Sequence, residues 1–199
     1  MIPYSCQNID EDDIKAVTEA LKSDFLTGGE RVEAFESALA RYLHVKHVVV
    51  VNSATSALHV AYRSIGLCDE DEIITTPITF AATANAALMC GAKPLFCDVK
   101  LDGNIDERKL EALITPKTKA IVPVDFGGNP VEIEAIKALC KRYNLVLIDD
   151  ASHALGSEIN GQKVGGFAHM SIFSFHAIKP ITTCGEGGAI ATNDSALYE

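Results

Sequence analysis

One lysine of this chain stands in a segment that favours covalent chemistry. Lys179 follows the apolar run at residues 171–175 and lies between Ile178 and Pro180, shortly before a glycine-rich turn at residues 185–188. A lysine amine removed from water has a lowered pKa and becomes a nucleophile that forms Schiff bases with carbonyl groups. The alternative is a lysine exposed on a loop, which is the commoner case for a single lysine, and glycines by themselves only mark a turn.

Two adjacent carboxylates, Asp149 and Asp150, end a second apolar run, and His153 follows them. On a strand their side chains point to opposite faces, so we expect one to be solvated or capping and the other to be free for a ligand cation. An aspartate that pairs with a pyridine nitrogen keeps that ring protonated, which makes it an electron sink. The alternative is that the aspartate before Ala-Ser-His starts a helix, with a structural His153.

A candidate anion site lies at residues 52–59 (NSATSALH), where small hydroxyl residues end a strand and open a helix. Serine or threonine caps a helix, and the free N–H groups of its first turn bind anions such as phosphate. A plain helix cap without a ligand explains the same residues. Taken together, the three segments supply an anion cradle, a partner for a pyridine nitrogen and a Schiff-base lysine, which predicts a phosphorylated pyridine cofactor.

The elements that must position these residues follow an α/β pattern. Short, nearly continuous apolar runs predict strands buried on both faces of a parallel sheet, at residues 47–51, 72–76, 94–98, 120–125, 145–149, 171–175 and 188–192. Apolar residues at helical spacing predict helices at residues 14–21, 32–43, 55–65, 80–89, 105–113 and 131–143. We therefore expect a doubly wound, seven-stranded, mostly parallel sheet with helices on both faces.

The last predicted strand is an exception to the parallel pattern. The chain between residues 175 and 188 is too short for a helical crossover, which takes about a dozen or more residues. We expect strand 188–192 to run antiparallel, at or near an edge. In such sheets ligands bind beyond the carboxyl ends of the parallel strands, which places the site at residues 52–56, 77–80, 125–129, 150–153 and 174–179.

Composition argues against several classes of function. A net charge of −10 disfavours a nucleic-acid partner, and no apolar run reaches the roughly eighteen residues of a membrane span. The histidines are scattered without metal-ligand spacing, so no metal site is expected. The six cysteines form no CxxC pair and the start lacks a signal-peptide pattern, so we expect free thiols and a cytoplasmic protein.

Five segments carry a family resemblance: FLTGGERVEAFESALARYL, VNSATSALH, TPITFAATANA, VLIDDASHALG and SFHAIKPITTCGEGGAI. In these residues, and in their order over nearly the whole chain, the sequence resembles the DegT/DnrJ/EryC1/StrS sugar aminotransferases, within the fold-type I enzymes that use pyridoxal 5′-phosphate (PLP). The segment around Lys179 is the most specific. Within the family the chain is most similar to the UDP-sugar aminotransferases of pseudaminic acid biosynthesis.

The resemblance implies PLP as the cofactor and two catalytic residues. Lys179 would form the Schiff base with PLP and then move the proton between the donor carbon and the cofactor. Asp150 would pair with the pyridine nitrogen.

The resemblance also implies the remaining cofactor contacts. The helix start at Ala54 and Thr55 would hold the phosphate, and Ser174 would add a hydroxyl. Phe80 would stack on the ring face, and His153 stands where the family has Gln or His near the ring.

The chain departs from the family pattern at three points. Ala54 replaces the usual glycine of Ser-Gly-Thr, although its N–H is kept. Asp125 stands where the family often has His, so no role is assigned to it. Family members are roughly twice as long, so residues 1–199 are expected to be the PLP-binding large domain without the C-terminal small domain.

The expected function is transfer of an amino group, from glutamate, to a keto group of a nucleotide-linked deoxysugar, UDP-4-keto-6-deoxy-N-acetylhexosamine. A homodimer is expected because an apolar sheet domain without its second domain exposes a hydrophobic face. Two alternatives are a PLP-dependent sugar dehydratase, which Lys179 disfavours because those relatives carry His there, and a truncated domain that binds PLP or a partner chain without turnover.

Overall fold

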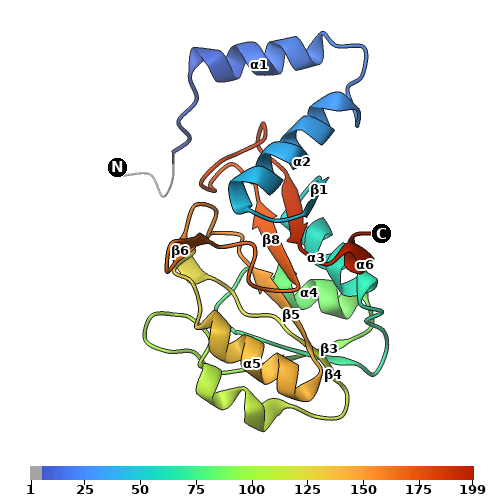
Figure 1. The fold of residues 1–199 in the computed structure, drawn as a ribbon, viewed down its shortest axis with the longest axis vertical. Coiled ribbons are helices and arrows are strands. Elements are labelled where there is room, and N and C mark those ends of the chain that lie inside the picture. Colours follow the sequence, from blue (N-terminus) through green and yellow to red (C-terminus); the bar gives the residue numbers. More distant parts are fainter. Residues whose placement is uncertain (1–5) are drawn as a thin grey trace.

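The computed structural model describes residues 6–199, and a seven-stranded sheet forms its centre (Figure 1). In chain order the strands are β1 His47–Val51, β2 Glu72–Thr75, β3 Lys93–Phe96, β4 Thr118–Ile121, β5 Val146–Asp150, β8 Met170–Ser174 and β9 Gly188–Thr192. Across the sheet their order is β1-β9-β8-β5-β4-β2-β3. Each run that was expected to form a strand overlaps one, so the predicted seven-stranded sheet is confirmed, although β4 ends at Ile121, four residues before the predicted end.

Strand β9 runs antiparallel to both of its neighbours, β8 and β1, whereas the other pairs in the sheet are parallel. It lies one strand inside the edge, which confirms the prediction of an antiparallel strand near an edge. In this position Gly188 is paired with Ser174 of β8 on one side and with Val51 of β1 on the other.

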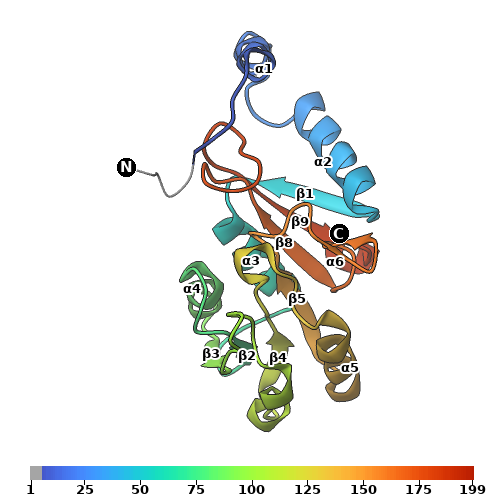
Figure 2. The ribbon, with the colours of Figure 1, turned by 90° about the vertical axis from the view of Figure 1, so that its left-hand side faces the viewer.

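Helices cover both faces of the sheet, as predicted (Figure 2). The helices α3 Ala54–Ser64 and α4 Ala82–Met89 pack on one face, and α2 Glu30–Leu43 and α5 Ile133–Tyr143 lie on the other. Successive side chains of β8 point to opposite faces of the sheet and pack in two different hydrophobic clusters. Ile172 packs in the same cluster as Tyr62 of α3, whereas Phe173 packs with Leu43 of α2.

The first helix, α1 Glu11–Leu21, stands away from the sheet in both ribbon views (Figures 1 and 2). Asp10 caps it through a capping box with Asp13, but none of its residues is buried. The last helix, α6 Ser195–Tyr198, packs beside β1 and β9. No helix in residues 6–199 is long and apolar enough to cross a membrane.

The helix expected at residues 105–113 is replaced by two short 3-10 turns, η1 Glu107–Lys109 and η2 Glu111–Leu113. The prediction was wrong because the start of the segment is held in other contacts. Ile105 forms an isolated bridge with Val99, and the Asp106 side chain accepts the backbone N–H of Arg108. Apolar spacing alone did not reveal these local contacts.

A small hairpin, β6 Glu158–Ile159 and β7 Gln162–Lys163, was not predicted. Its turn residues Asn160 and Gly161 both have positive φ, 52° and 78°. An Asn-Gly pair is the usual two-residue hairpin turn, so the signal for this hairpin was present in the sequence.

Candidate active site

The residues predicted to act together follow strands that end at one edge of the sheet. The carboxyl ends of β1, β2, β4, β5 and β8 meet there because these strands run in the same direction. Since β9 is antiparallel, its first residue, Gly188, also lies at this edge. The topology therefore brings the start of α3, the loop before α4, Asp125, Asp150 and the Lys179 segment to the same side.

The start of α3 has the form of an anion site. The Ser53 hydroxyl accepts the N–H of Ser56 at 3.1 Å, and the Ser53 carbonyl accepts the N–H of Ala57 at 3.0 Å. The two other N–H groups of the first turn, those of Ala54 and Thr55, are the ones that a helix leaves for an external acceptor.

Gly188 lies directly against this helix start. A Cβ atom at Gly188 would lie 2.4 Å from the Ser53 carbonyl carbon and 2.5 Å from the Ala54 nitrogen. Ser174, the strand partner of Gly188, is buried, and its Oγ accepts the N–H of His176 at 3.4 Å. The missing side chain at Gly188 thus allows Ser174 and the start of α3 to come together, which fits a small anion such as a phosphate.

Asp150 is buried, and three hydrogen bonds fix its side chain. Oδ2 accepts the Thr83 hydroxyl at 2.7 Å, and Oδ1 accepts the Ser152 hydroxyl at 2.6 Å and the Ser152 N–H at 3.3 Å. Tyr62 donates to the Thr83 carbonyl at 2.9 Å. The residues after Asp150 form turns and no helix, so the helix-cap alternative is wrong.

Thr83 and Tyr62 were not among the predicted site residues, and Ser152 lies in the predicted segment 150–153 but had no role assigned. Thr83 is fully buried in the alanine-rich helix α4, whereas the other polar residue of this helix, Asn85, is exposed. A polar residue within an apolar helical segment was the available signal. Nothing in the sequence indicated that this threonine would face Asp150, because the two are 67 positions apart.

The expectation that one of the paired carboxylates is solvated or caps a helix is wrong. Asp149 does point away from Asp150, but it is only 2% exposed, and its Oδ1 has no hydrogen-bond partner within residues 6–199. Burial, with the neighbouring charges of Asp125 and Asp150, raises the pKa of Asp149 well above the ordinary value. Asp125 is buried as well, and burial with the charge of Asp150 raises its pKa to about 7.

Lys179 is half-buried in the loop that follows β8, where its N–H donates to the His176 carbonyl at 2.9 Å. Burial lowers the pKa of the Lys179 amine, and the negative charge of Asp150 partly opposes that effect. Burial and the charge of Lys179 lower the pKa of His153, whereas the charge of Asp150 raises it. Lys179, Asp150 and His153 are therefore electrostatic neighbours.

Phe80 lies in the loop between β2 and α4, and its side chain is 76% exposed. Its carbonyl accepts the Thr83 N–H at 3.2 Å, so the backbone at Phe80 is linked to the residue that contacts Asp150. The ring itself remains uncovered at the site edge.

Three features lie at one edge of this mixed sheet: a helix start suited to an anion, a hydrogen-bonded carboxylate and a half-buried lysine. This arrangement is typical of enzymes that bind phosphorylated cofactors. Residues 7–199 match the model of the DegT/DnrJ/EryC1/StrS aminotransferase family, and the chain belongs to this family.

Three relatives are similar to this chain over nearly its whole length. A UDP-4-amino-4,6-dideoxy-N-acetyl-beta-L-altrosamine transaminase of Campylobacter jejuni is 60% identical over 99% of this chain and 53% of its own length. The solved structure of Helicobacter pylori PseC, an aminotransferase involved in pseudaminic acid biosynthesis, has a TM-score of 0.95 and 55% identity over 98% of this chain and 53% of that one. Spr1654 of Streptococcus pneumoniae, solved in its PLP form, has a TM-score of 0.91 and 32% identity over 98% and 54%. The chain thus spans about half the length of the relatives it matches.

Proposed function

We propose that residues 1–199, of which 1–5 lie outside the described part, form the PLP-binding large domain of a sugar aminotransferase. The proposed reaction moves an amino group from glutamate to the keto group of UDP-4-keto-6-deoxy-N-acetylhexosamine. The observation that carries the proposal is the arrangement of Lys179, Asp150 and the start of α3 at one sheet edge. The names of the similar transaminases, which refer to a UDP-linked amino-dideoxy sugar, support the substrate class.

The residues at the sheet edge fit PLP. The N–H groups of Ala54 and Thr55, with the Ser174 hydroxyl, would hold the phosphate at the helix start, which β9 approaches closely because residue 188 has no side chain. Asp150 would pair with the pyridine nitrogen. When bound, PLP supplies an electron sink for the carbon that carries the amino group.

The other proposed roles belong to side chains of this chain. Lys179 would hold the cofactor through Nζ, and its lowered pKa favours an amine that gives up and takes back a proton. The hydroxyls of Thr83 and Ser152 keep the Asp150 carboxylate in one orientation. Phe80 and His153 would lie against the ring.

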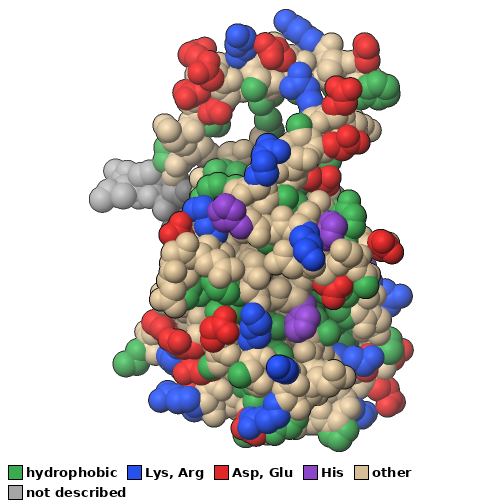
Figure 3. All heavy atoms as spheres, in the orientation of Figure 1, with side chains coloured by type: hydrophobic (Ala, Val, Ile, Leu, Met, Phe, Trp, Pro, Cys, Tyr) green, Lys and Arg blue, Asp and Glu red, His purple; other side chains and the backbone are tan. Residues whose placement is uncertain are grey.

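We propose a homodimer on the basis of exposed apolar side chains. Ile14, Val17 and Leu21 share one side of α1 and are 51%, 38% and 69% exposed, and Phe25 and Leu26 after the helix are 76% and 71% exposed. Figure 3 shows open space between α1 and the rest of the molecule. Exposed apolar groups of this kind mark interfaces. A monomer in light scattering of the full chain at micromolar concentration would contradict the dimer.

Borohydride reduction of the PLP-treated protein, followed by peptide mass spectrometry, tests the cofactor assignment. We expect a pyridoxyl adduct on Lys179, loss of the adduct in Lys179→Ala, and an unchanged adduct in the control Lys117→Ala, whose lysine pairs with Glu70 on the surface. An adduct that maps to another lysine would contradict the proposed orientation of the cofactor. An adduct on Lys179 without 2-oxoglutarate formation from glutamate and the UDP-sugar would favour the alternative of a binding domain without turnover.

A further inference from the structure

The loop at residues 126–130 (FGGNP), which begins with the 3-10 turn η3 Phe126–Gly128, packs directly on His153. The Gly127 N–H donates to His153 Nδ1 at 3.3 Å, and the Phe126 ring lies edge-on to the imidazole with centroids 6.3 Å apart. A Cβ atom on Gly128 would lie 2.9 Å from the His153 carbonyl oxygen. Three consecutive loop residues therefore contact His153.

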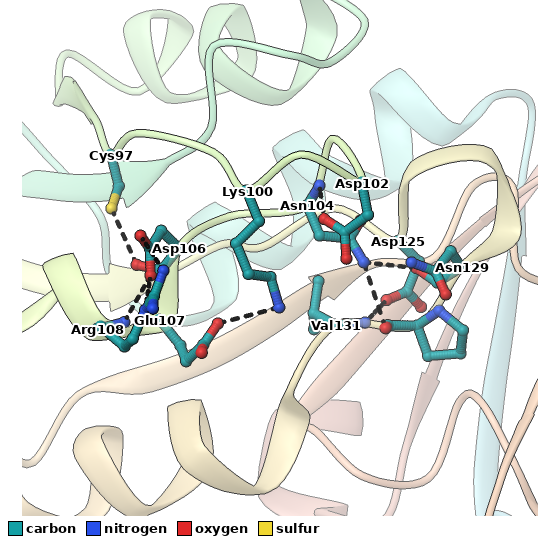
Figure 4. A network of polar contacts seen from close by, with 11 residues as sticks. Cys97, Lys100, Asp102, Asn104, Asp106, Glu107, Arg108, Asp125, Asn129 and Val131 are labelled. Carbon is teal, nitrogen blue, oxygen red and sulfur yellow. Dashed lines mark hydrogen bonds and ion pairs between the residues drawn. The ribbon is translucent and has the colours of Figure 1, made fainter.

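The Asn104 side chain forms hydrogen bonds to both ends of this loop, and Figure 4 shows those at the Asn129 end. Its Oδ1 accepts the Phe126 N–H at 3.0 Å, and its Nδ2 donates to the carbonyls of Asn129 and Pro130 at 2.9 and 3.3 Å. Asn104 is only 1% exposed, so water does not compete for these bonds. One side chain from a distant segment thus fixes the path of the whole loop.

Asp125, at the end of the loop next to the sheet, also fixes the loop through hydrogen bonds. Its Oδ1 accepts the Val131 N–H at 2.9 Å, and its carbonyl accepts the Gly128 N–H at 3.0 Å. Its own N–H donates to the Asp150 carbonyl at 3.2 Å, which ties the loop to the strand that carries Asp150. An asparagine could make the same side-chain bond, because only an acceptor oxygen is needed.

The contact from Gly127 determines which nitrogen of His153 carries the proton. A backbone N–H can donate only to a ring nitrogen with a free lone pair, so Nδ1 is unprotonated and the hydrogen of the neutral ring is on Nε2. The other charged groups that act on this ring, Lys179 and Asp150, have opposing effects on its pKa.

We propose that Asn104 and Asp125 are positioning residues that fix the 126–130 loop and thereby hold His153 as the neutral Nε2–H tautomer beside Lys179 and Asp150. The consequence for cofactor binding rests on the proposed function, because only there does His153 lie against the PLP ring. In this state His153 offers a single hydrogen-bond donor to the site and adds no positive charge next to Lys179.

The test is a pH titration of the ring nitrogens of ¹⁵N-histidine-labelled full chain by NMR, before and after incubation with PLP. His153→Gln identifies the His153 signals. In the wild type we expect the Nε2–H tautomer and a pKa below the ordinary value of about 6.5. In Asn104→Ala and Asp125→Ala we expect a mixture of tautomers and a pKa raised by about 0.5 to 1 unit, because one neutral-state hydrogen bond is lost.

Two controls separate positioning from a general loss of stability. Asp125→Asn keeps the acceptor for Val131 and should retain the wild-type tautomer. Thr118→Ala removes the partly buried hydrogen bond from the Thr115 N–H to the Thr118 hydroxyl, at the opposite end of β4, and should leave His153 unchanged. The proposal is overturned if Asn104→Ala and Asp125→Ala keep the wild-type His153 signals, or if either control shifts these signals as much as the two alanine variants do.

If the alanine variants do not fold, a wild-type His153 that is protonated on Nδ1 at neutral pH overturns the proposal directly. The spectra before PLP is added do not depend on the cofactor, so a missing adduct on Lys179 would contradict the proposed function alone.

Discussion

The substitution Gly188→Ala tests the close approach between β9 and the start of α3. The added Cβ would lie 2.4 Å from the carbonyl carbon of Ser53, 2.6 Å from its oxygen and 2.5 Å from the nitrogen of Ala54. Optimal carbon contacts are about 3.5 Å or longer, so the helix start or the strand must shift by about 1 Å. Backbone atoms cannot rotate away as a side chain can, so the shift falls on the proposed phosphate site.

The size of the effect follows from overpacking and from the loss of anion contacts. Overpacking costs about 1 to 3 kcal/mol, which for a chain of this length lowers Tm by about 2 to 12 °C. One lost hydrogen bond from Ala54 or Thr55 to a charged phosphate costs about 1.5 to 3 kcal/mol, which weakens PLP binding roughly 10- to 100-fold.

The assay is a PLP titration followed by absorbance, together with a thermal melt. Gly166→Ala is the matched control, because Gly166 does not have a positive φ and a Cβ there would meet its nearest atoms at 3.5 to 3.8 Å, an ordinary contact distance. We expect the control to bind PLP and to melt like the wild type. A Gly188→Ala variant with wild-type affinity and an unchanged Tm would refute the close approach and the phosphate site built on it.

Three further predictions concern the buried polar groups. Asp150→Asn should still give the pyridoxyl adduct on Lys179 but slow the half-reaction with glutamate about 100-fold or more, because a neutral amide cannot keep the ring nitrogen protonated; equal stopped-flow rates would count against this role. Asp149 has a pKa that is raised in the folded state, so its contribution to stability is present below the ordinary carboxyl pKa and is lost as pH rises. Asp149→Asn should therefore reduce the loss of stability as pH rises above the ordinary carboxyl pKa, by at most about 1.4 kcal/mol per pH unit, and an unchanged slope in urea unfolding would contradict it. Thr83→Val should lower the free energy of unfolding by about 1 to 3 kcal/mol because the buried Asp150 loses a donor, and a urea midpoint equal to that of the wild type would argue against this bond.

The sequence by itself determined the order of the elements and the identity of the residues at the sheet edge. Apolar runs bounded by turn residues located all seven strands of the central sheet, and the short chain before Gly188 predicted the antiparallel direction of β9. The segments around Lys179, Asp150 and Ala54 were recognisable because they place polar residues directly after buried strands. These features are local, so a single sequence contains them.

Only the tertiary structure decided what surrounds those residues. Alternation placed Asp149 on the face opposite Asp150, but burial of that carboxylate depends on the other elements that cover the face. The requirement for glycine at 188 comes from Ser53, far away in the chain, and the state of His153 depends on a loop that Asn104 holds. Periodicity reports which way a side chain points, whereas its partners are brought together by strand order and helix packing between segments that lie far apart in the sequence.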